Sequence, residues 1–341
     1  MTPATLDRLL AVLVLAMAGT GLATLRAGTE ASEWVYVAHG VLAGALGAAI
    51  VAKVRRSVPR AAGTGHRARL LYGLVVTLVA AAALSGGYLW VAGGELLTVG
   101  SWTILTLHAW LGLALVPLVA VHLLPRRWRL LRLPSRAVLA TPSRGALRPR
   151  LTRRTVVSGG VLALAGIGGY ATAALADRLR GGERRFTGSR FLPSGGIPPP
   201  TTFFGEPAPP IDPGSWRLTV SGRVDRPLDL DLADLVALGE RDALAVLDCT
   251  SGWAMETTWR GVPLGAVLRA AEAPSGVRRV TIRSVTGWST TLTVAEADGC
   301  LLATKVAGSS LPEPNGAPVR LVVPSRRGLD WIKWVSEVSV G

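Results

Sequence analysis

Histidine is missing from the second half of this chain, and its absence limits the chemistry that this half can perform. The 341 residues contain four histidines, of which the last is His122. A region without histidine has no Ser-His-Asp triad, no histidine-bound zinc and no histidine general base. We therefore expect no ordinary hydrolase chemistry after residue 122.

Other scarce residue types narrow the candidates for a site. Glutamine is absent, asparagine occurs once, at Asn315, and cysteine occurs twice, at Cys249 and Cys300. Asn315 either starts an Asn-Gly turn or offers a donor and an acceptor to a heteroaromatic ligand. Cys249 is either an inert buried thiol, the simpler interpretation from composition alone, or a soft thiolate ligand for a transition metal. Cys300 is expected to be a buried helix residue.

Acidic residues are scarce in the first half. Residues 1–182 carry 20 Lys and Arg against 5 Asp and Glu, whereas residues 183–341 carry 17 of each kind. The net charge of +15 therefore belongs to the first half. Because that half is strongly apolar, the charge does not indicate the basic surface of a nucleic-acid-binding domain, and we expect no nucleic-acid partner.

Five apolar runs in the first half are each near the roughly 20 residues that cross about 30 Å of hydrocarbon. They predict an all-α transmembrane bundle of four helices plus a fifth, linking helix, in contact with membrane lipid. The loops at 53–69 and 125–154 hold six and ten basic residues and no acid, so the positive-inside rule makes them cytoplasmic. This predicts a multi-pass protein of a bacterial cell (inner) membrane, with a cytoplasmic N-terminus and an extracytoplasmic C-terminal half. The runs lie at about 9–25, 34–52, 68–91, 102–124 and 155–176.

Composition divides the chain into five parts. The parts are a transmembrane bundle (1–125), a basic cytoplasmic loop (126–154), a fifth transmembrane helix (155–176), an extended Pro- and Gly-rich linker (177–214) and a folded domain (215–341).

Arg153 and Arg154, before the fifth run, are typical of a twin-arginine export signal and equally of an ordinary membrane helix with basic flanks.

The last part alternates short strand and helix patterns, which predicts an α+β domain. Strands are expected at 216–220, 243–247, 280–285, 290–294, 319–323 and 331–340. Helices are expected at 231–238, 263–271 and 295–301.

The first half contains an internal repeat. The segment HGVLAGALGAAIVAK from His39 aligns without a gap on HAWLGLALVPLVAVH from His108, which matches His39 with His108 and Lys53 with His122. A parallel repeat of helical hairpins brings His39 and His108 face to face. A histidine inside a membrane span is costly without a partner, so this pair either binds a metal between its rings or is hydrogen-bonded across the helices.

The spacing of 14 residues from His108 to His122 resembles that of the four-helix di-haem cytochrome b subunits of respiratory formate dehydrogenases and hydrogenases. Over 14 residues a helix rises about 21 Å and returns to nearly the same face. The resemblance implies haem b on His39 and His108, near the outer membrane face. A second haem iron would bind His122 and take as its partner His66, at the mouth of the third helix, or Met17, which lies deeper in the first helix.

Two motifs in the last part resemble one enzyme family. LDCTSGWAMETTWRGVPL (Leu247–Leu264) and NGAPVRLVVPSRRGLDWIKWVSEVSV (Asn315–Val340) are similar to the molybdopterin-binding oxidoreductase domain of the sulfite oxidase family. They are most like bacterial periplasmic methionine sulfoxide reductases and sulfite dehydrogenases. The resemblance covers about residues 203–341. It implies a sulfite-oxidase-like α+β fold and a molybdopterin cofactor whose molybdenum is ligated by Cys249, which would exclude a disulfide between Cys249 and Cys300.

The resemblance also implies roles for other residues. A molybdenum centre transfers an oxygen atom with the metal and its oxo groups, so the protein supplies a thiolate, orientation and positive charge instead of a histidine base. Arg260 and Arg326 would supply charge at the catalytic centre. Residues 288–307 depart from the sulfoxide reductase pattern, so the resemblance does not fix the substrate. The cofactor would be bound by Cys249, Ser284, Asn315, Arg320, Trp331, Ile332 and Lys333.

These predictions describe a membrane-bound molybdenum oxidoreductase that transfers an oxygen atom to or from a small substrate of the sulfite or sulfoxide class outside the cytoplasm. Electrons would pass through haem b to or from the quinone pool. Two alternatives stay open. In one the helices only anchor the enzyme and a separate cytochrome is the redox partner, and in the other the last part is a cofactor-free extracytoplasmic binding module.

Overall fold

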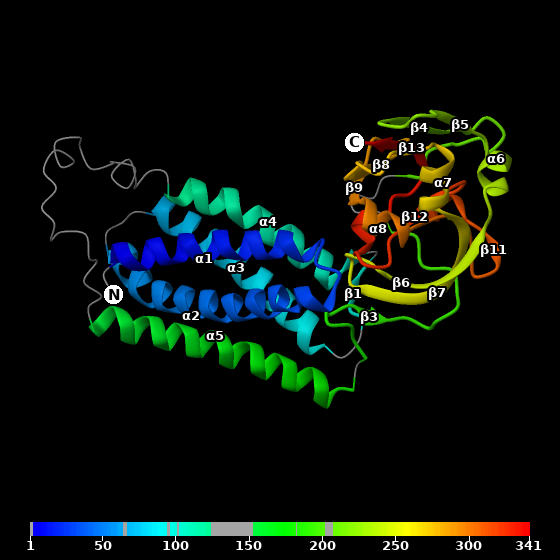
Figure 1. The fold of residues 1–341 in the computed structure, drawn as a ribbon. Coiled ribbons are helices and arrows are strands. Elements are labelled where there is room, and N and C mark those ends of the chain that lie inside the picture. Colours follow the sequence, from blue (N-terminus) through cyan, green and yellow to red (C-terminus); the bar gives the residue numbers. More distant parts are fainter. Residues whose placement is uncertain are drawn as a thin grey trace, which may run out of the picture. The chain divides into compact units, whose positions relative to one another are not determined.

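The structure, a computed structural model, describes residues 3–63, 67–93, 96–100, 102–123, 153–181, 183–201 and 207–341 (Figure 1). The chain separates into two compact units, a helical unit (Met1–Ala23 and Trp34–Gly182) and a C-terminal unit (Thr24–Glu33 and Glu183–Gly341). Each unit has its own set of buried apolar side chains.

In the described part of the chain, five helices are long and apolar enough to cross a membrane by length and composition. They coincide with the five apolar runs, which confirms these runs as helices. Their outward faces carry exposed apolar side chains such as Leu164, which is 71% exposed, and such a surface suits lipid better than water. The helices are α1 (Pro3–Thr24), α2 (Glu33–Gly63), α3 (Arg67–Ala92), α4 (Ile104–Leu123) and α5 (Arg153–Leu179). The short elements η1 (Glu30–Ser32), β1 (Thr98–Val99) and β2 (Trp102–Thr103) lie in the connections.

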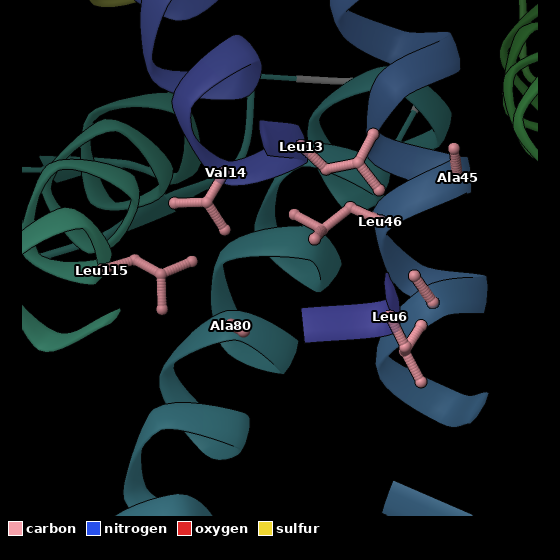
Figure 2. Close-up of a cluster of buried hydrophobic side chains, with 8 residues drawn as sticks. Leu6, Leu13, Val14, Ala45, Leu46, Ala80 and Leu115 are labelled. Carbon is pink, nitrogen blue, oxygen red and sulfur yellow. The ribbon is translucent and has the colours of Figure 1, made fainter. Parts of the chain in front are cut away.

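The helical unit packs around small and medium-sized apolar side chains (Figure 2). Helices α1 to α4 each contribute to this cluster, so the two predicted hairpins share one core. Its members are Leu6, Leu13, Val14, Ala45, Leu46, Ala49, Ala80 and Leu115.

Glycines bring α5 against α2. A Cβ on Gly166 of α5 would lie 2.4 Å from the carbonyl oxygen of Val41, and a Cβ on Gly44 of α2 would lie 2.8 Å from the Gly166 Cα atom. Only glycine permits so close an approach of two helix backbones. The fifth helix therefore packs on the bundle. In the sequence it also connects the bundle to the C-terminal unit.

The C-terminal unit is an α+β fold with two sheets. One sheet has the order β11-β10-β7-β3, with β12 paired to β10 and β6 paired to β7, and the other has the order β5-β4-β13-β8-β9. Neighbouring strands are antiparallel except for β3 with β7 and β4 with β13. The strands are β3 (Arg190–Phe191), β4 (Leu218–Gly222), β5 (Leu228–Leu230), β6 (Arg241–Asp248), β7 (Trp253–Pro263), β8 (Arg279–Ser284), β9 (Ser289–Thr293), β10 (Leu301–Val306), β11 (Ser309–Ser310), β12 (Arg320–Val322) and β13 (Val335–Val340). The helices are α6 (Leu232–Ala237), α7 (Leu264–Ala270) and α8 (Val294–Asp298), with the short helices η4 (Glu313–Asn315) and η5 (Gly328–Asp330).

The predicted strands and helices of this unit all have counterparts, but the sequence patterns miss β3, β7, β10 and β11 of the first sheet and β5 of the second. β7 is 11 residues long, yet its buried face includes Thr257 and Gly261, which hides the apolar alternation. β10 begins at Leu301, where the pattern predicts the end of a helix, because α8 already ends with Gly299 as its C-cap. Cys300 therefore lies between α8 and β10, and its predicted place inside a helix is wrong.

Gly261 lies where β7 pairs with β10. A Cβ at this position would lie 2.1 Å from the carbonyl oxygen of Leu302. Gly261→Ala is therefore expected to lower the free energy of unfolding of the C-terminal unit by about 1–3 kcal/mol, measured by denaturant unfolding followed by tryptophan fluorescence. Gly276→Ala, at an exposed position with open space around it, is the control and is expected to change stability by less than about 0.5 kcal/mol. Equal losses in the two variants would contradict the close-packing explanation.

Candidate functional site

The β6–β7 hairpin holds Cys249 at its turn. Cys249 directly follows β6, and β7 begins at Trp253. The Cys249 amide donates a hydrogen bond to the Trp253 carbonyl (2.8 Å), and the amide of Gly252, which has a φ of +103°, donates to the Cys249 carbonyl (3.0 Å). The half-buried Cys249 Sγ atom lies 3.0 Å from the Ser251 Oγ atom. The thiol is thus held at a fixed point at the end of a strand.

The residue before Cys249 anchors this hairpin. Asp248 is 1% exposed, and its carboxylate accepts hydrogen bonds from Thr187 Oγ1 (2.7 Å) and Ser189 Oγ (2.6 Å). The buried Arg327 guanidinium lies 3.2 Å from the same carboxylate and also donates to the Cys249 carbonyl (2.9 Å). Buried charges are tolerated when they are paired and hydrogen-bonded, a condition that this network meets. The ion pair of Asp248 and Arg327 therefore fixes the backbone that carries the thiol.

The segment after β12 packs directly against the backbone that carries the thiol. A Cβ on Gly328 would lie 3.4 Å from the Cys249 Cα atom and 3.2 Å from the Asp248 carbonyl oxygen. Arg327 and Gly328 thus hold the same loop, the first through charge and the second through close contact.

Arg320 carries a charge that interacts with Cys249. β12 places its Cζ atom 5.5 Å from the ring centroid of Trp259 and 5.9 Å from that of Trp331. Burial lowers the pKa of the Arg320 guanidinium to about 10, and the negative charge of a Cys249 thiolate counteracts the shift. Arg320 Nη1 donates to the Asn315 carbonyl (2.9 Å). Among the described residues, the buried Arg320 Nε and Trp259 Nε1 atoms have no hydrogen-bond partner.

These two buried donors need an acceptor that the described polypeptide does not supply. An unpartnered buried N–H costs about 1–3 kcal/mol, and buried polar groups in native proteins are nearly always satisfied. A positive charge with a spare donor, close to a thiol, suits an anionic group that accepts hydrogen bonds. The residues around Arg320 therefore fit an anionic cofactor that also binds a thiolate.

Asn315 and Lys333 hold a segment that precedes the domain in sequence. Asn315, 2% exposed, donates through Nδ2 to the Pro198 carbonyl (2.8 Å). Lys333 Nζ donates to the carbonyls of Thr201 (2.9 Å) and Pro314 (2.8 Å). Part of the predicted linker thus packs within the C-terminal unit, against two residues with predicted cofactor contacts.

The remaining residues with predicted cofactor contacts are buried. Trp331 and Ile332 are each 1% exposed, and the Trp331 indole donates to a backbone carbonyl (3.0 Å). They lie before β13, which begins later than predicted and follows Trp334, whose φ is +53°. Ser284, at the end of β8, accepts hydrogen bonds from the amide (3.2 Å) and hydroxyl (3.0 Å) of Thr286. These side chains have protein partners, and their contacts with a cofactor stay a prediction.

Arg260 and Arg326 each have an acidic partner, and their predicted role at the catalytic centre stays a prediction. Arg260 lies on β7, seven residues and on the order of 20 Å from the end of the strand next to Cys249, and pairs with Glu240 (3.1 Å). Arg326 pairs with Glu296 (2.8 Å) and donates to a carbonyl of β9. These ion pairs favour a structural role for both arginines.

The two cysteines are free thiols with different surroundings. Cys300 donates to the Glu296 carbonyl (3.1 Å), and burial raises the pKa of its thiol to about 12. Cys300 is therefore an inert packing residue, as predicted. Cys249 is the more accessible thiol.

Sequence patterns miss the network that holds the thiol loop. No pattern separates Arg327, which turns inward to Asp248, from its neighbour Arg326. Asp248 does give a signal, because an acidic residue at the buried end of an apolar strand needs a cationic partner. The identity of that partner requires the fold.

The helical unit brings two of the four histidines together. The ring centroids of His39 (α2) and His108 (α4) lie 6.0 Å apart, and the ring planes meet at 88°. Nδ1 of His39 is hydrogen-bonded to Thr20 Oγ1 (2.8 Å), and Nδ1 of His108 to the Ala83 carbonyl (2.7 Å). Nε2 is then the ring nitrogen of each residue that can bind a metal. A Cβ on Gly87 would lie 3.0 Å from the His108 ring, so α3 passes close to it.

His122 does not join this pair. His122 stacks on Tyr72, with ring centroids 5.8 Å apart and planes at 9°, and His66 lies outside the described residues. Within the described ranges, no three or more His, Cys, Asp or Glu side chains are grouped as a metal site.

Comparison with known families identifies the C-terminal unit. Residues 205–341 match the family described as oxidoreductase molybdopterin binding domain. This part of the chain is therefore a molybdopterin-binding domain of the oxidoreductase class, in agreement with the resemblance to the sulfite oxidase family. The spare buried donors of Arg320 and Trp259 are consistent with this class.

Two curated relatives are bacterial enzymes. The chain is 33% identical over 141 residues to the protein-methionine-sulfoxide reductase catalytic subunit MsrP of Xanthomonas campestris pv. campestris, which covers 36% of this chain and 44% of the relative. It is 30% identical over 148 residues to MsrP of Gluconobacter oxydans, which covers 37% of this chain and 47% of the relative. The chain thus spans less than half the length of these relatives. The crystal structure of the sulfane dehydrogenase SoxCD from Paracoccus pantotrophus matches 39% of this chain and 40% of that chain at 23% identity, with a TM-score of 0.38.

Loss of the Asp248 charge is expected to destabilise the C-terminal unit. Asp248→Asn leaves Arg327 buried without its anion, and breaking a buried pair in this way costs about 3–5 kcal/mol. Denaturant unfolding of the purified protein measures this loss. Asp242→Asn, which removes an exposed carboxylate paired with Arg260, is the control and is expected to cost less than about 1 kcal/mol. A loss in Asp248→Asn no larger than in the control would show that the network is not required.

Proposed function

We propose that this protein is a membrane-bound, molybdopterin-dependent oxidoreductase that transfers an oxygen atom from or to a small substrate of the sulfoxide or sulfite class. One observation carries the proposal. A molybdopterin-binding domain here contains a half-buried thiol at the end of a strand, Cys249, and a buried cation, Arg320, that retains an unused donor.

The residues around this pair would hold the cofactor. When bound, molybdenum supplies a metal centre that exchanges an oxygen atom and two electrons with substrate. Cys249 would be its thiolate ligand, because a thiolate is a soft ligand and this thiol is half-buried instead of enclosed. The Arg320 Nε and Trp259 Nε1 donors would bind anionic groups of the cofactor. Further contacts would come from Ser284, Asn315, Trp331, Ile332 and Lys333.

A sulfoxide is the favoured substrate. Both curated relatives are named as reductases of protein methionine sulfoxide. Reduction of a sulfoxide takes up two electrons and two protons and releases a thioether and water. Sulfite, the other predicted substrate, would react in the opposite direction, since its oxidation with water yields sulfate, two protons and two electrons.

The helical unit would supply the electrons through one haem b bound by His39 and His108, in exchange with the quinone pool. The centroid separation of 6.0 Å supports this assignment, because metal–imidazole bonds of about 2.0 Å place one metal ion between two facing rings. The Nδ1 hydrogen bonds to Thr20 and Ala83 orient both rings, as second-shell partners of metal-bound histidines do. When bound, the haem iron carries one electron at a time.

The five apolar helices support insertion in a bacterial inner membrane, with the N-terminus in the cytoplasm and the C-terminal domain outside it. Two alternatives predict different results. A helical unit that is only an anchor needs a separate cytochrome and binds no haem. A cofactor-free binding module contains no molybdenum.

Replacing Cys249 tests the molybdenum site. Cys249→Ser is expected to lower methionine sulfoxide reduction, with reduced methyl viologen as donor, by roughly a hundredfold or more, since weakening even an outer-shell partner costs 10–100-fold. The viologen assay measures this loss, and metal analysis expresses it per bound molybdenum. A Cys249→Ser protein with full activity per molybdenum would refute the assignment.

The matched control is the second cysteine. Cys300→Ala is expected to keep its molybdenum and activity, because this thiol is buried with a pKa of about 12. Alkylation with iodoacetamide at pH 8 adds a readout that does not depend on activity. Peptide mapping is expected to find Cys249 modified only after cofactor removal and Cys300 unmodified in both states.

Replacing His108 tests the haem. His108→Ala and His39→Ala are each expected to abolish the Soret band of a b-type haem, because each removes one of two axial ligands, while molybdenum content stays unchanged. Visible spectra and metal analysis of the purified proteins measure this. His122→Ala is the control and is expected to retain the band. An unchanged Soret band in His108→Ala, or its absence from the unmodified protein, would favour the simple anchor.

A further inference from the structure

Trp288 is the exposed tryptophan of the C-terminal unit. It is 46% exposed, whereas the other five tryptophans of this unit are buried. Single exposed apolar residues are common on protein surfaces, so the surroundings of the ring decide whether it has a role. The buried tryptophans are Trp216, Trp253, Trp259, Trp331 and Trp334.

The Trp288 indole is fixed beside the segment that packs against the Cys249 backbone. Its Nε1 atom donates a hydrogen bond to the Leu329 carbonyl (3.2 Å). Leu329 directly follows Gly328, where a Cβ would lie 3.4 Å from the Cys249 Cα atom. The ring is therefore one hydrogen bond and one residue away from the glycine that adjoins the thiol loop. An aromatic ring held in this way offers a rigid apolar face to a ligand.

A tight turn joins Trp288 to a residue with a predicted cofactor contact. The amide of Ser284, at the end of β8, donates to the Trp288 carbonyl (2.8 Å), and the Ser284 carbonyl accepts from the Gly287 amide (2.9 Å). Gly287 has a φ of +85°, which this turn requires. Val285, in the same turn, is also exposed. Two exposed apolar side chains thus lie on one short turn that follows Ser284.

The arginines near Leu329 are in ion pairs. Arg326 pairs with Glu296 (2.8 Å) and lies 3.7 Å from the Asp330 carboxylate. Arg26, which belongs to the same unit, lies 4.0 Å from Asp330. Two carboxylates thus balance two arginines, whereas a small anion such as sulfite binds best to a cation that has no anionic partner. These surroundings suit a neutral substrate with an apolar group better than an anion.

Resting on the proposed function, in which a sulfoxide is reduced at the molybdenum site, we propose that Trp288 and Val285 form the subsite for the alkyl group on the substrate sulfur. Sulfur and its neighbouring carbons make favourable contacts with aromatic rings, and each buried methylene strengthens binding. The subsite therefore selects sulfoxides with longer alkyl groups over dimethyl sulfoxide. Trp288 begins the stretch that departs from the sulfoxide reductase pattern, so the family resemblance does not imply this role.

A series of methyl alkyl sulfoxides tests the subsite in the full-length holoprotein. Reduction of dimethyl, methyl ethyl and methyl propyl sulfoxide is followed with reduced methyl viologen, which bypasses the helical unit. In the unmodified protein KM is expected to fall by about twofold to fourfold for each added methylene. In Trp288→Ala this dependence is expected to shrink to less than about 1.5-fold, while kcat changes by less than about twofold because only substrate binding is lost.

Two matched variants separate contact with substrate from a structural role. Trp288→Phe keeps an aromatic face but removes the donor to Leu329, and it is expected to keep the dependence of KM on alkyl length. Leu244→Ala removes another exposed apolar side chain, on β6, and is expected to leave every KM within about twofold of the unmodified value. Metal analysis of each variant is expected to find an unchanged molybdenum content.

Several results would overturn the inference. They are equal KM values for the three sulfoxides in the unmodified protein, an unchanged dependence in Trp288→Ala, and equal losses in Trp288→Ala and Trp288→Phe, which would assign the effect to the hydrogen bond with Leu329. Activity with sulfite and with none of the sulfoxides would also overturn it and leave a molybdenum enzyme in place. A protein that lacks molybdenum, or that acts on neither class of substrate, is a failure of the proposed function.

Oxidative footprinting gives a result that needs no variant. Hydroxyl radicals oxidise exposed side chains, and methyl propyl sulfone serves as an unreactive analogue of the substrate. When it is added in excess, the sulfone is expected to lower the oxidation of Trp288 by at least about twofold and to leave that of Leu244 unchanged. Equal protection of the two residues, or protection of neither, would contradict the subsite.

Discussion

The buried ion pair between Asp248 and Arg327 is the constraint on which the thiol site depends. It joins the end of β6 to the segment after β12, and Arg327 also binds the Cys249 carbonyl. Two charges in a buried environment lose their hydration, so they are stable only in one arrangement with every hydrogen bond formed. A flexible turn therefore becomes a rigid support for one sulfur atom. The ion pair of the preceding residue, Asp248, with Arg327 therefore positions the Cys249 backbone. The Cys249 side chain takes no part in this ion pair.

Arg320 shows the opposite situation, a buried charge whose partners are incomplete. The rings of Trp259 and Trp331 stabilise it through cation–π contacts, and one of its nitrogens has no acceptor among the described residues. A ligand that completes these bonds binds only the folded state and so adds to its stability. Folding of the domain and loading of the cofactor are thus expected to be coupled through this one guanidinium.

The sequence predicts much of this arrangement because its strongest signals are local. Apolar runs identify the helices, the repeat brings His39 and His108 together, and two motifs identify the domain and its thiol. It fails where the deciding contact is between distant segments. β7 is hidden because Thr257 occupies a buried position, and the pairing of Arg326 with Glu296 is visible only in the fold.

The segment between α5 and β4 has a consequence for how such a chain can be assembled in evolution. Thr187 and Ser189 bind Asp248, and Pro198 accepts a hydrogen bond from Asn315, yet all three lie before the residues that match the family. A recombination event that joined a membrane anchor at residue 205 would remove Thr187, Ser189 and Pro198 together with these hydrogen bonds. The exchangeable module therefore begins near residue 183, and a viable fusion has to transfer this leading segment together with the catalytic domain.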